Sequence, residues 1–282
     1  MTALSRIVVG VDGHSSGWEG LRLAQRFLRL GGGHLTVACA YPELGLQHAG
    51  LMWNGMATEP DARRVLREAR THLDAPEAAD FVAVCGAMPG ACLQDVASQC
   101  DADLLVLGGS QTGTIGRVLG GSVLMAALVA PPCPVAVAPR GGETVLRGMT
   151  HVGVAVDGSP EAAAALRWAH ELALEHDSIH ELALIAAAGG AHADVPGHGR
   201  SELLAGGAGD VRHGRGALDV RWTQVSGPAA RELAALTMRL DLLVIGTHGR
   251  GRLSRLLHGS VSGDVARSSR CPVVAVPFTS DA

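Results

Sequence analysis

The sequence predicts an α/β protein built from two tandem repeats, each containing a five-stranded parallel sheet with covering helices. Segments of the second half match segments of the first half at nearly constant spacing, which indicates an internal repeat. Strand-like and helix-like segments alternate within each half, as crossover units of a parallel sheet require. Only 3% of the residues are aromatic, and the apolar content is mostly Ala, Val and Leu. That composition suits buried parallel strands and amphipathic helices.

Three pairs of segments define the repeat. Residues 6–13 match residues 151–158, and Asp157 follows Asp12 by 145 positions. The other two pairs are 138 residues apart and comprise 103–108 with 241–246, and 133–139 with 271–277. The smaller spacing implies that the second repeat has lost residues between its first and fourth strands. We therefore expect domains at residues 1–140 and 150–282, joined by a short linker at 140–149.

The first repeat shows its elements most clearly. Strands are predicted at residues 5–11, 34–41, 79–85, 103–108 and 134–138. The helix predicted at 17–30 has an inward face of Trp18, Leu21, Ala24, Gln25 and Leu28 and an opposite face of Arg22, Arg26 and Arg29. The glycines at 31–33 are expected to end this helix.

The second repeat has a stronger first helix, predicted at residues 161–175. Ser159 is a suitable N-cap, and Pro160 suits the first turn. Residues 189–216 are rich in Gly, Ala and His and stand where the first repeat has an Arg-rich helix near 61–73. We expect a long, partly mobile connection there.

Composition excludes several functions. The net charge of −4 offers no general field for a polyanion, so no nucleic-acid partner is expected. All 23 basic residues are Arg, which excludes a P-loop lysine and a Schiff-base lysine. No stretch approaches the ~20 apolar residues of a membrane span, and no signal peptide is evident. The six cysteines form no CxxC pair, so we expect a reducing, cytoplasmic location.

A glycine-rich loop follows the predicted fourth strand of the second repeat. Its pattern is Gly246-x2-Gly249-x9-Gly259-Ser260, with another serine at position 262. Glycines allow a phosphate to approach the backbone, and the free amides of a helix N-terminus favour an anion. Asp157 follows the first strand, so it is expected at the same rim of the sheet, where it could accept from adenine or ribose.

These features together resemble the universal stress protein family over nearly the whole chain. The resemblance rests on the Val-Asp-Gly-Ser start at 156–159, the glycine loop at 246–262 and the Cys-Pro-Val segments at 133 and 271. It implies a Rossmann-like fold related to the adenine nucleotide alpha hydrolases, with helices on both faces of the sheet. It also implies ATP as the ligand, with magnesium or manganese at the phosphates. The implied ligand contacts in the second repeat are Asp157, Ala187, Gly246, Gly249, Gly259, Ser260, Val261 and Ser262.

The first repeat departs from the family pattern. It keeps the equivalents Asp12, Gly108, Gly121 and Ser122, but Gln111 replaces the middle glycine and Leu124 replaces the last serine. A glutamine can block phosphate approach, and leucine removes a hydroxyl donor. We predict that the first site binds nucleotide more weakly or is vestigial.

Other candidate groups carry less specific signals. Loop arginines at 250, 252 and 255 could reach a triphosphate, and His192, His198 and His213 have no recognised metal-site spacing. Cys133 and Cys271 suit buried positions at the start of matching strands better than a redox role. We find no Gly-x-Ser-x-Gly, His-Glu-x-x-His or Walker lysine motif, so no catalytic residue is assigned.

The functional prediction is an ATP-binding stress-response or signalling protein whose bound nucleotide changes the surface offered to a protein partner. Two alternatives remain open, a scaffold that binds no nucleotide and a slow ATPase. Strands 135–138 and 273–276 are expected near the contact of an intramolecular pseudo-dimer, because apolar edge strands need cover. Further homodimerisation is an additional possibility.

Overall fold

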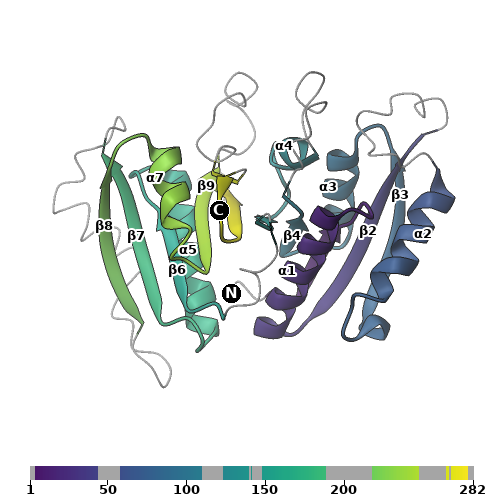
Figure 1. Ribbon diagram of the computed structural model, residues 1–282, viewed down its shortest axis with the longest axis horizontal. Coiled ribbons are helices and arrows are strands. Elements are labelled where there is room, and N and C mark those ends of the chain that lie inside the picture. The colour runs from purple at the N-terminus through teal and green to yellow at the C-terminus, as the bar shows by residue number, and fades with distance from the viewer. Residues whose placement is uncertain are drawn as a thin grey trace. The chain divides into compact units, whose positions relative to one another are not determined.

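The computed structural model confirms an α/β fold in which each half of the chain contributes five parallel strands (Figure 1). It describes residues 4–43, 58–109, 123–139, 141, 148–188, 218–247, 265–266 and 268–278. The chain divides into two compact units, one of residues Leu4–Arg140 and the other containing Gly141–Ala282. Here they are called repeat 1 and repeat 2.

Repeat 1 alternates strands and helices in the predicted order. Its elements are β1 (Arg6–Gly10), α1 (Ser15–Gly31), β2 (His34–Pro42), α2 (Glu59–Arg70), a 3₁₀ turn (Pro76–Ala78), β3 (Ala79–Gly86), α3 (Pro89–Gln99), β4 (Leu104–Leu107), α4 (Val123–Ala127) and β5 (Val135–Val137). The strand order is β3-β2-β1-β4-β5, and every pair is parallel. Right-handed crossovers place α1 and α2 on one face and α3 on the other (Figure 1).

Repeat 2 follows the same plan. Its described elements are β6 (His151–Ala155), α5 (Pro160–Glu175), β7 (Glu181–Ala188), β8 (Asp219–Ser226), α7 (Ala229–Leu236), β9 (Leu242–Thr247) and β10 (Val273–Pro277). The order β8-β7-β6-β9-β10, again all parallel, matches repeat 1 strand for strand. The central strands β6 and β9 are buried almost throughout, as their Val and Leu content predicts.

Helix ends follow the local signals in the sequence. The Ser159 hydroxyl accepts a hydrogen bond from Ala162 N at 3.2 Å and caps α5, whose first residue is Pro160. The first helix of repeat 1 ends at Gly31, and Gly32 then adopts φ +70° while its N–H bonds to Leu28 O.

One prediction about α1 is wrong. Arg26 was expected on the outward face with Arg22 and Arg29, but its side chain is buried, with only 8% of the residue exposed. The neighbouring Gln25 is buried as well, and its side-chain amide donates to His72 O and accepts from Asp74 N, just beyond the end of α2. Periodicity alone assigned the Arg26 flank of α1 to solvent, and the tertiary structure buries it.

Candidate functional site

The rim formed by the carboxyl ends of the strands carries Asp157 and Gly246, two described members of the predicted binding set. Strands β6 and β9 are neighbours, and the chain proceeds from them toward opposite edges of the sheet. This is the switch point at which open parallel sheets bind their ligands. The corresponding point in repeat 1 lies between β1 and β4.

Asp157 projects from this rim in repeat 2. It is exposed two residues beyond β6, and its Oδ1 accepts bonds from Ser159 N at 3.0 Å and Ser159 Oγ at 2.5 Å. Gly158 adopts φ +80°, a conformation that few side-chain-bearing residues adopt, and so turns the chain into α5. Within the described residues no bond is made to Oδ2, which leaves that oxygen for a ligand.

Repeat 1 contains the same turn with a different cap. The Asp12 Oδ1 atom accepts from His14 N at 3.0 Å, and Gly13 has φ +78°. His14 replaces the serine of repeat 2, and its Nδ1 lies 3.1 Å from Asp12 O and 3.5 Å from Asp12 Oδ2. The histidine makes no side-chain cap for α1. The two rims are therefore alike in backbone and different in side chain.

Gly246 and Gly108 have a packing role that the sequence interpretation missed. A Cβ at position 246 would overlap the carbonyl group of Glu161 in the first turn of α5 and would lie 2.8 Å from Ala162 N. A Cβ at position 108 would overlap the Ser16 carbonyl in the same way. Glycine lets the first helix of each repeat approach the fourth strand. A glycine at the end of the fourth strand in both repeats therefore indicates close helix packing as well as a possible ligand contact.

The remaining predicted contacts are only partly described. Ala187 lies on β7 and pairs with Val225, two positions beyond Ile185, which pairs with Ala155. Repeat 1 has Ala40 at the equivalent register position, opposite Val84. In both repeats this alanine lies on the second strand, two residues beyond the partner of the first strand's last residue. Ala187 therefore lies toward the same rim as Asp157.

Several predictions lie outside the described residues. These are Gly121, Ser122, Gly249, Gly259, Ser260, Val261 and Ser262, the arginines at 250, 252 and 255, Gln111, the histidines at 192, 198 and 213, and the connection at 189–216. They stay predictions.

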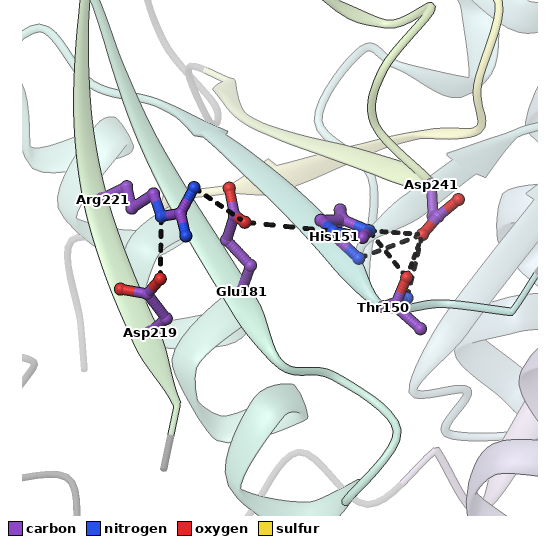
Figure 2. A network of polar contacts seen from close by, with 6 residues as sticks. All are labelled: Thr150, His151, Glu181, Asp219, Arg221 and Asp241. Carbon is purple, nitrogen blue, oxygen red and sulfur yellow. Dashed lines mark hydrogen bonds and ion pairs between the residues drawn. The ribbon is translucent and has the colours of Figure 1, made fainter.

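A polar network at the opposite, amino rim of repeat 2 was not predicted (Figure 2). Asp241 Oδ2 accepts bonds from Thr150 N, Thr150 Oγ1 and His151 N at 2.8–3.0 Å. Burial raises the pKa of Asp241, but these hydrogen bonds outweigh it and hold the pKa below its ordinary value. Arg221 joins the network through Glu181, 3.6 Å from its Nη1.

In repeat 2, Asp241 lies directly before the fourth strand and accepts hydrogen bonds from the start of the first strand; we call this contact the aspartate clamp. Repeat 1 has the same clamp. Asp103 Oδ2 accepts from Ser5 N at 3.0 Å and Arg6 N at 2.8 Å. An aspartate directly before the fourth strand of both repeats was the signal that could have revealed this contact. Because it joins the fourth strand to the first at the end away from the candidate site, its role is structural.

The cysteines fit structural positions. Both Cys133 and Cys271 are buried, as predicted, and burial raises the pKa of Cys133 to about 12. Cys39 is also buried, with its pKa raised to about 12 by burial and by Asp12. Among the described side chains, Cys85 is the exposed thiol.

The described residues contain neither a metal-binding cluster nor a helix that could span a membrane. No cluster of three or more His, Cys, Asp or Glu side chains in these residues is arranged to hold a metal ion. None of the described helices combines the length and apolarity needed to cross a bilayer.

Comparison with known proteins connects the repeated geometry to a family. The model of the universal stress protein family matches residues 4–139 and again residues 149–277. The chain belongs to the universal stress protein family. Its two family domains correspond to repeat 1 and repeat 2, each with an Asp-Gly turn after its first strand.

Related universal stress proteins occur in Mycobacterium tuberculosis. Rv2005c is 32% identical over 190 residues, which cover 62% of this chain and 61% of that relative. The match therefore spans about three fifths of the length of Rv2005c. Rv2319c is 27% identical over 290 residues, which cover 96% of this chain and 99% of the relative. A universal stress protein from Archaeoglobus fulgidus has a TM-score of 0.77 at 20% identity, covering 100% of this chain and 99% of that one, which supports the fold.

Proposed function

We propose that this universal stress protein binds ATP through repeat 2 and acts in stress response or signalling by nucleotide-dependent contact with a partner. The observation that carries the proposal is the exposed Asp157 carboxylate at the switch point of a parallel sheet. The sequence of the following loop, with glycines at 246, 249 and 259 and serines at 260 and 262, suits a phosphate chain.

Each end of the nucleotide has a suitable part of the rim. The Asp157 carboxylate would accept from an adenine amine or a ribose hydroxyl. The backbone amides of the glycine loop would bind the phosphates. Magnesium or manganese would enter with the phosphates, since such hard cations prefer oxygen ligands.

Repeat 1 is proposed as the weaker site. It keeps Asp12 and its turn, but Gln111 and Leu124 replace a glycine and a serine of the loop. The two repeats are further proposed to form an intramolecular pseudo-dimer in the cytoplasm, with nucleotide-dependent surfaces at the rims.

Isothermal titration of nucleotide-stripped protein with ATP and magnesium tests the proposal. We expect tight binding near one ATP per chain, followed by a weaker second event. Two equal sites would refute the assignment of repeat 1 as weaker. Complete absence of binding would refute the ATP proposal and favour a scaffold that works through protein contacts alone.

An ATPase is the remaining alternative, because phosphoryl transfer depends mainly on positioning and charge. Release of phosphate over many turnovers separates it from simple binding. We expect at most weak hydrolysis, and rapid turnover abolished by Asp157→Asn would overturn the non-enzymatic assignment.

A further inference from the structure

The rim carboxylate of repeat 1 is contacted at both of its oxygens by His14. Asp12 Oδ1 accepts a hydrogen bond from His14 N at 3.0 Å. The imidazole Nδ1 of the same histidine lies 3.1 Å from Asp12 O and 3.5 Å from Asp12 Oδ2. Because a carbonyl oxygen can only accept, Nδ1 carries a proton in this contact, and the N–H group also attracts Oδ2. Both carboxylate oxygens of Asp12 therefore face polar hydrogens of His14.

Repeat 2 has a serine, Ser159, at the position of His14, two residues after the aspartate in both cases. The N and Oγ atoms of Ser159 both donate to Asp157 Oδ1, and the hydroxyl accepts from Ala162 N at the start of α5. Asp157 is exposed, whereas Asp12 is partly buried. The serine thus directs its contacts to one carboxylate oxygen, whereas the histidine reaches both.

The first turn of α1 also gives the Asp12 carboxylate room to lie against the helix. A Cβ placed on Gly17 would be 2.6 Å from Asp12 Oδ1 and 3.0 Å from Asp12 N. The corresponding residue of repeat 2 is Ala162, which carries a Cβ. The preceding residues, Ser16 and Glu161, support this correspondence, because the carbonyl group of each lies against the glycine near the end of the fourth strand. Asp12 Oδ1 therefore lies closer to its helix than the alanine of repeat 2 would allow.

We infer that His14 lowers the affinity of the repeat 1 site for the nucleoside part of a nucleotide, because its imidazole competes with the ligand for the Asp12 carboxylate. This inference rests on the proposed nucleotide-binding function, in which the carboxylate accepts from an adenine amine or a ribose hydroxyl. A ligand at Asp12 must displace the histidine N–H from Oδ2, whereas a ligand at Asp157 meets an Oδ2 that no described residue binds. The first site is then weakened at its nucleoside end as well as by Gln111 and Leu124 in the loop.

Two-site titration of the full chain with adenosine and, separately, with magnesium ATP tests this inference. His14→Ser gives repeat 1 the turn residue of repeat 2 and should strengthen binding at repeat 1 about threefold, as release of an exposed polar pair predicts. The gain should be equal for the two ligands, because the histidine acts on the nucleoside and not on the phosphates. His34→Ser is the matched control, since His34 is an equally exposed histidine that contacts Asp80 at the amino rim of the same repeat. It should leave both affinities unchanged.

Two further variants identify the contact itself. In an Asp12→Asn background, His14→Ser should bring no gain, because the carboxylate for which the histidine competes is gone. In repeat 2, Ser159→His should weaken the tight site about threefold. Ser159→Ala is its control, because it removes the same hydroxyl and helix cap without adding an imidazole, and it should weaken the tight site less.

The outcomes separate this inference from the proposed function. Equal affinity of repeat 1 in wild type and His14→Ser, or a gain for ATP without a gain for adenosine, would overturn the inference while the tight site stands. An equal gain in the Asp12→Asn background would overturn it as well. A wild-type chain that binds no nucleotide at either site would overturn the proposed function itself.

Discussion

The carbonyl group of Glu161 occupies the space that a side chain at position 246 would need. Ser16 and Gly108 stand in the same relation in repeat 1. In each repeat, the first helix begins against the end of the fourth strand, at the rim where the ligand is proposed to bind. Glycine at this position therefore serves the fold whether or not a nucleotide is bound.

Replacing Gly246 with alanine should destabilise repeat 2 even without nucleotide. The added methyl group must displace the first turn of α5, and such overpacking costs roughly 1–3 kcal/mol of unfolding free energy. Urea denaturation of the nucleotide-free protein measures the change. Gly148→Ala is the control, because the nearest atom to its Cβ is 3.6 Å away. Equal stability of the two variants would contradict the packing argument.

The two rim aspartates should differ in their importance for ATP. Asp157→Asn keeps a side-chain oxygen that can accept from Ser159, so the turn should be preserved. It removes the negative charge, so any loss of affinity reports on the contact with the ligand. We expect roughly a tenfold loss at the tight site, the effect of weakening one charge-assisted bond. Asp12→Asn should leave the tight site unchanged in the same titration. A loss of tight binding in the Asp12 variant alone would reverse the assignment of the repeats.

Asp241 should contribute to stability above about pH 4 and lose that contribution in acid. Its pKa is lower in the folded state than in the unfolded state, so the unfolded chain binds more protons as the pH falls. Asp241→Ala should lower the unfolding free energy at pH 7 by about 1–3 kcal/mol, because Thr150 and His151 lose their acceptor. Urea titrations at pH 7 and below pH 4 would show a smaller acid-induced loss in the variant. An unchanged pH dependence would argue against the clamp.

His170 and His176 should make repeat 2 sensitive to mild acid. Burial lowers the pKa of both imidazoles below 6.5, despite nearby glutamates, and no partner for either Nε2 is found among the described residues. The unfolded chain therefore gains protons first, and stability should fall as the pH drops below about 6.5.

Combined replacement His170→Gln and His176→Leu should reduce this loss. Glutamine is the residue that repeat 1 has at the equivalent position, Gln25. Urea midpoints at pH 7.5 and 5.5 give the comparison. A midpoint shift as large in the double variant as in wild type would assign the acid sensitivity to other groups.

Thiol labelling should distinguish Cys85 from the buried cysteines. The pKa values of about 12 for Cys39 and Cys133 leave almost no thiolate at pH 8, and burial blocks access. Brief treatment of the native protein with iodoacetamide, followed by mass spectrometry, should modify Cys85 first. Rapid labelling of Cys133 would revive a redox role for the strand cysteines.

The sequence determined the architecture because its signals are local and repeated. Buried runs such as residues 103–108 predict parallel strands, and Ser159 with Pro160 predicts the start of a helix. The match between halves then predicts that both have the same fold. The turn residues Asp12 and Asp157 were identifiable because each follows a predicted first strand, whose carboxyl end lies at the ligand-binding rim of an open parallel sheet.

Tertiary structure decided what periodicity cannot express, namely which groups from distant segments meet. Arg26 on α1 is buried although its spacing predicted exposure. Contact with Glu161 gives Gly246 a packing role, and the Thr150–Asp241 clamp joins residues 91 positions apart. The helical and strand periods in a sequence specify which face of an element is apolar. Which other element packs against that face depends on how the helices are arranged on the sheet. For this reason the fold could be predicted from the sequence, while the reasons for particular residues within it could not.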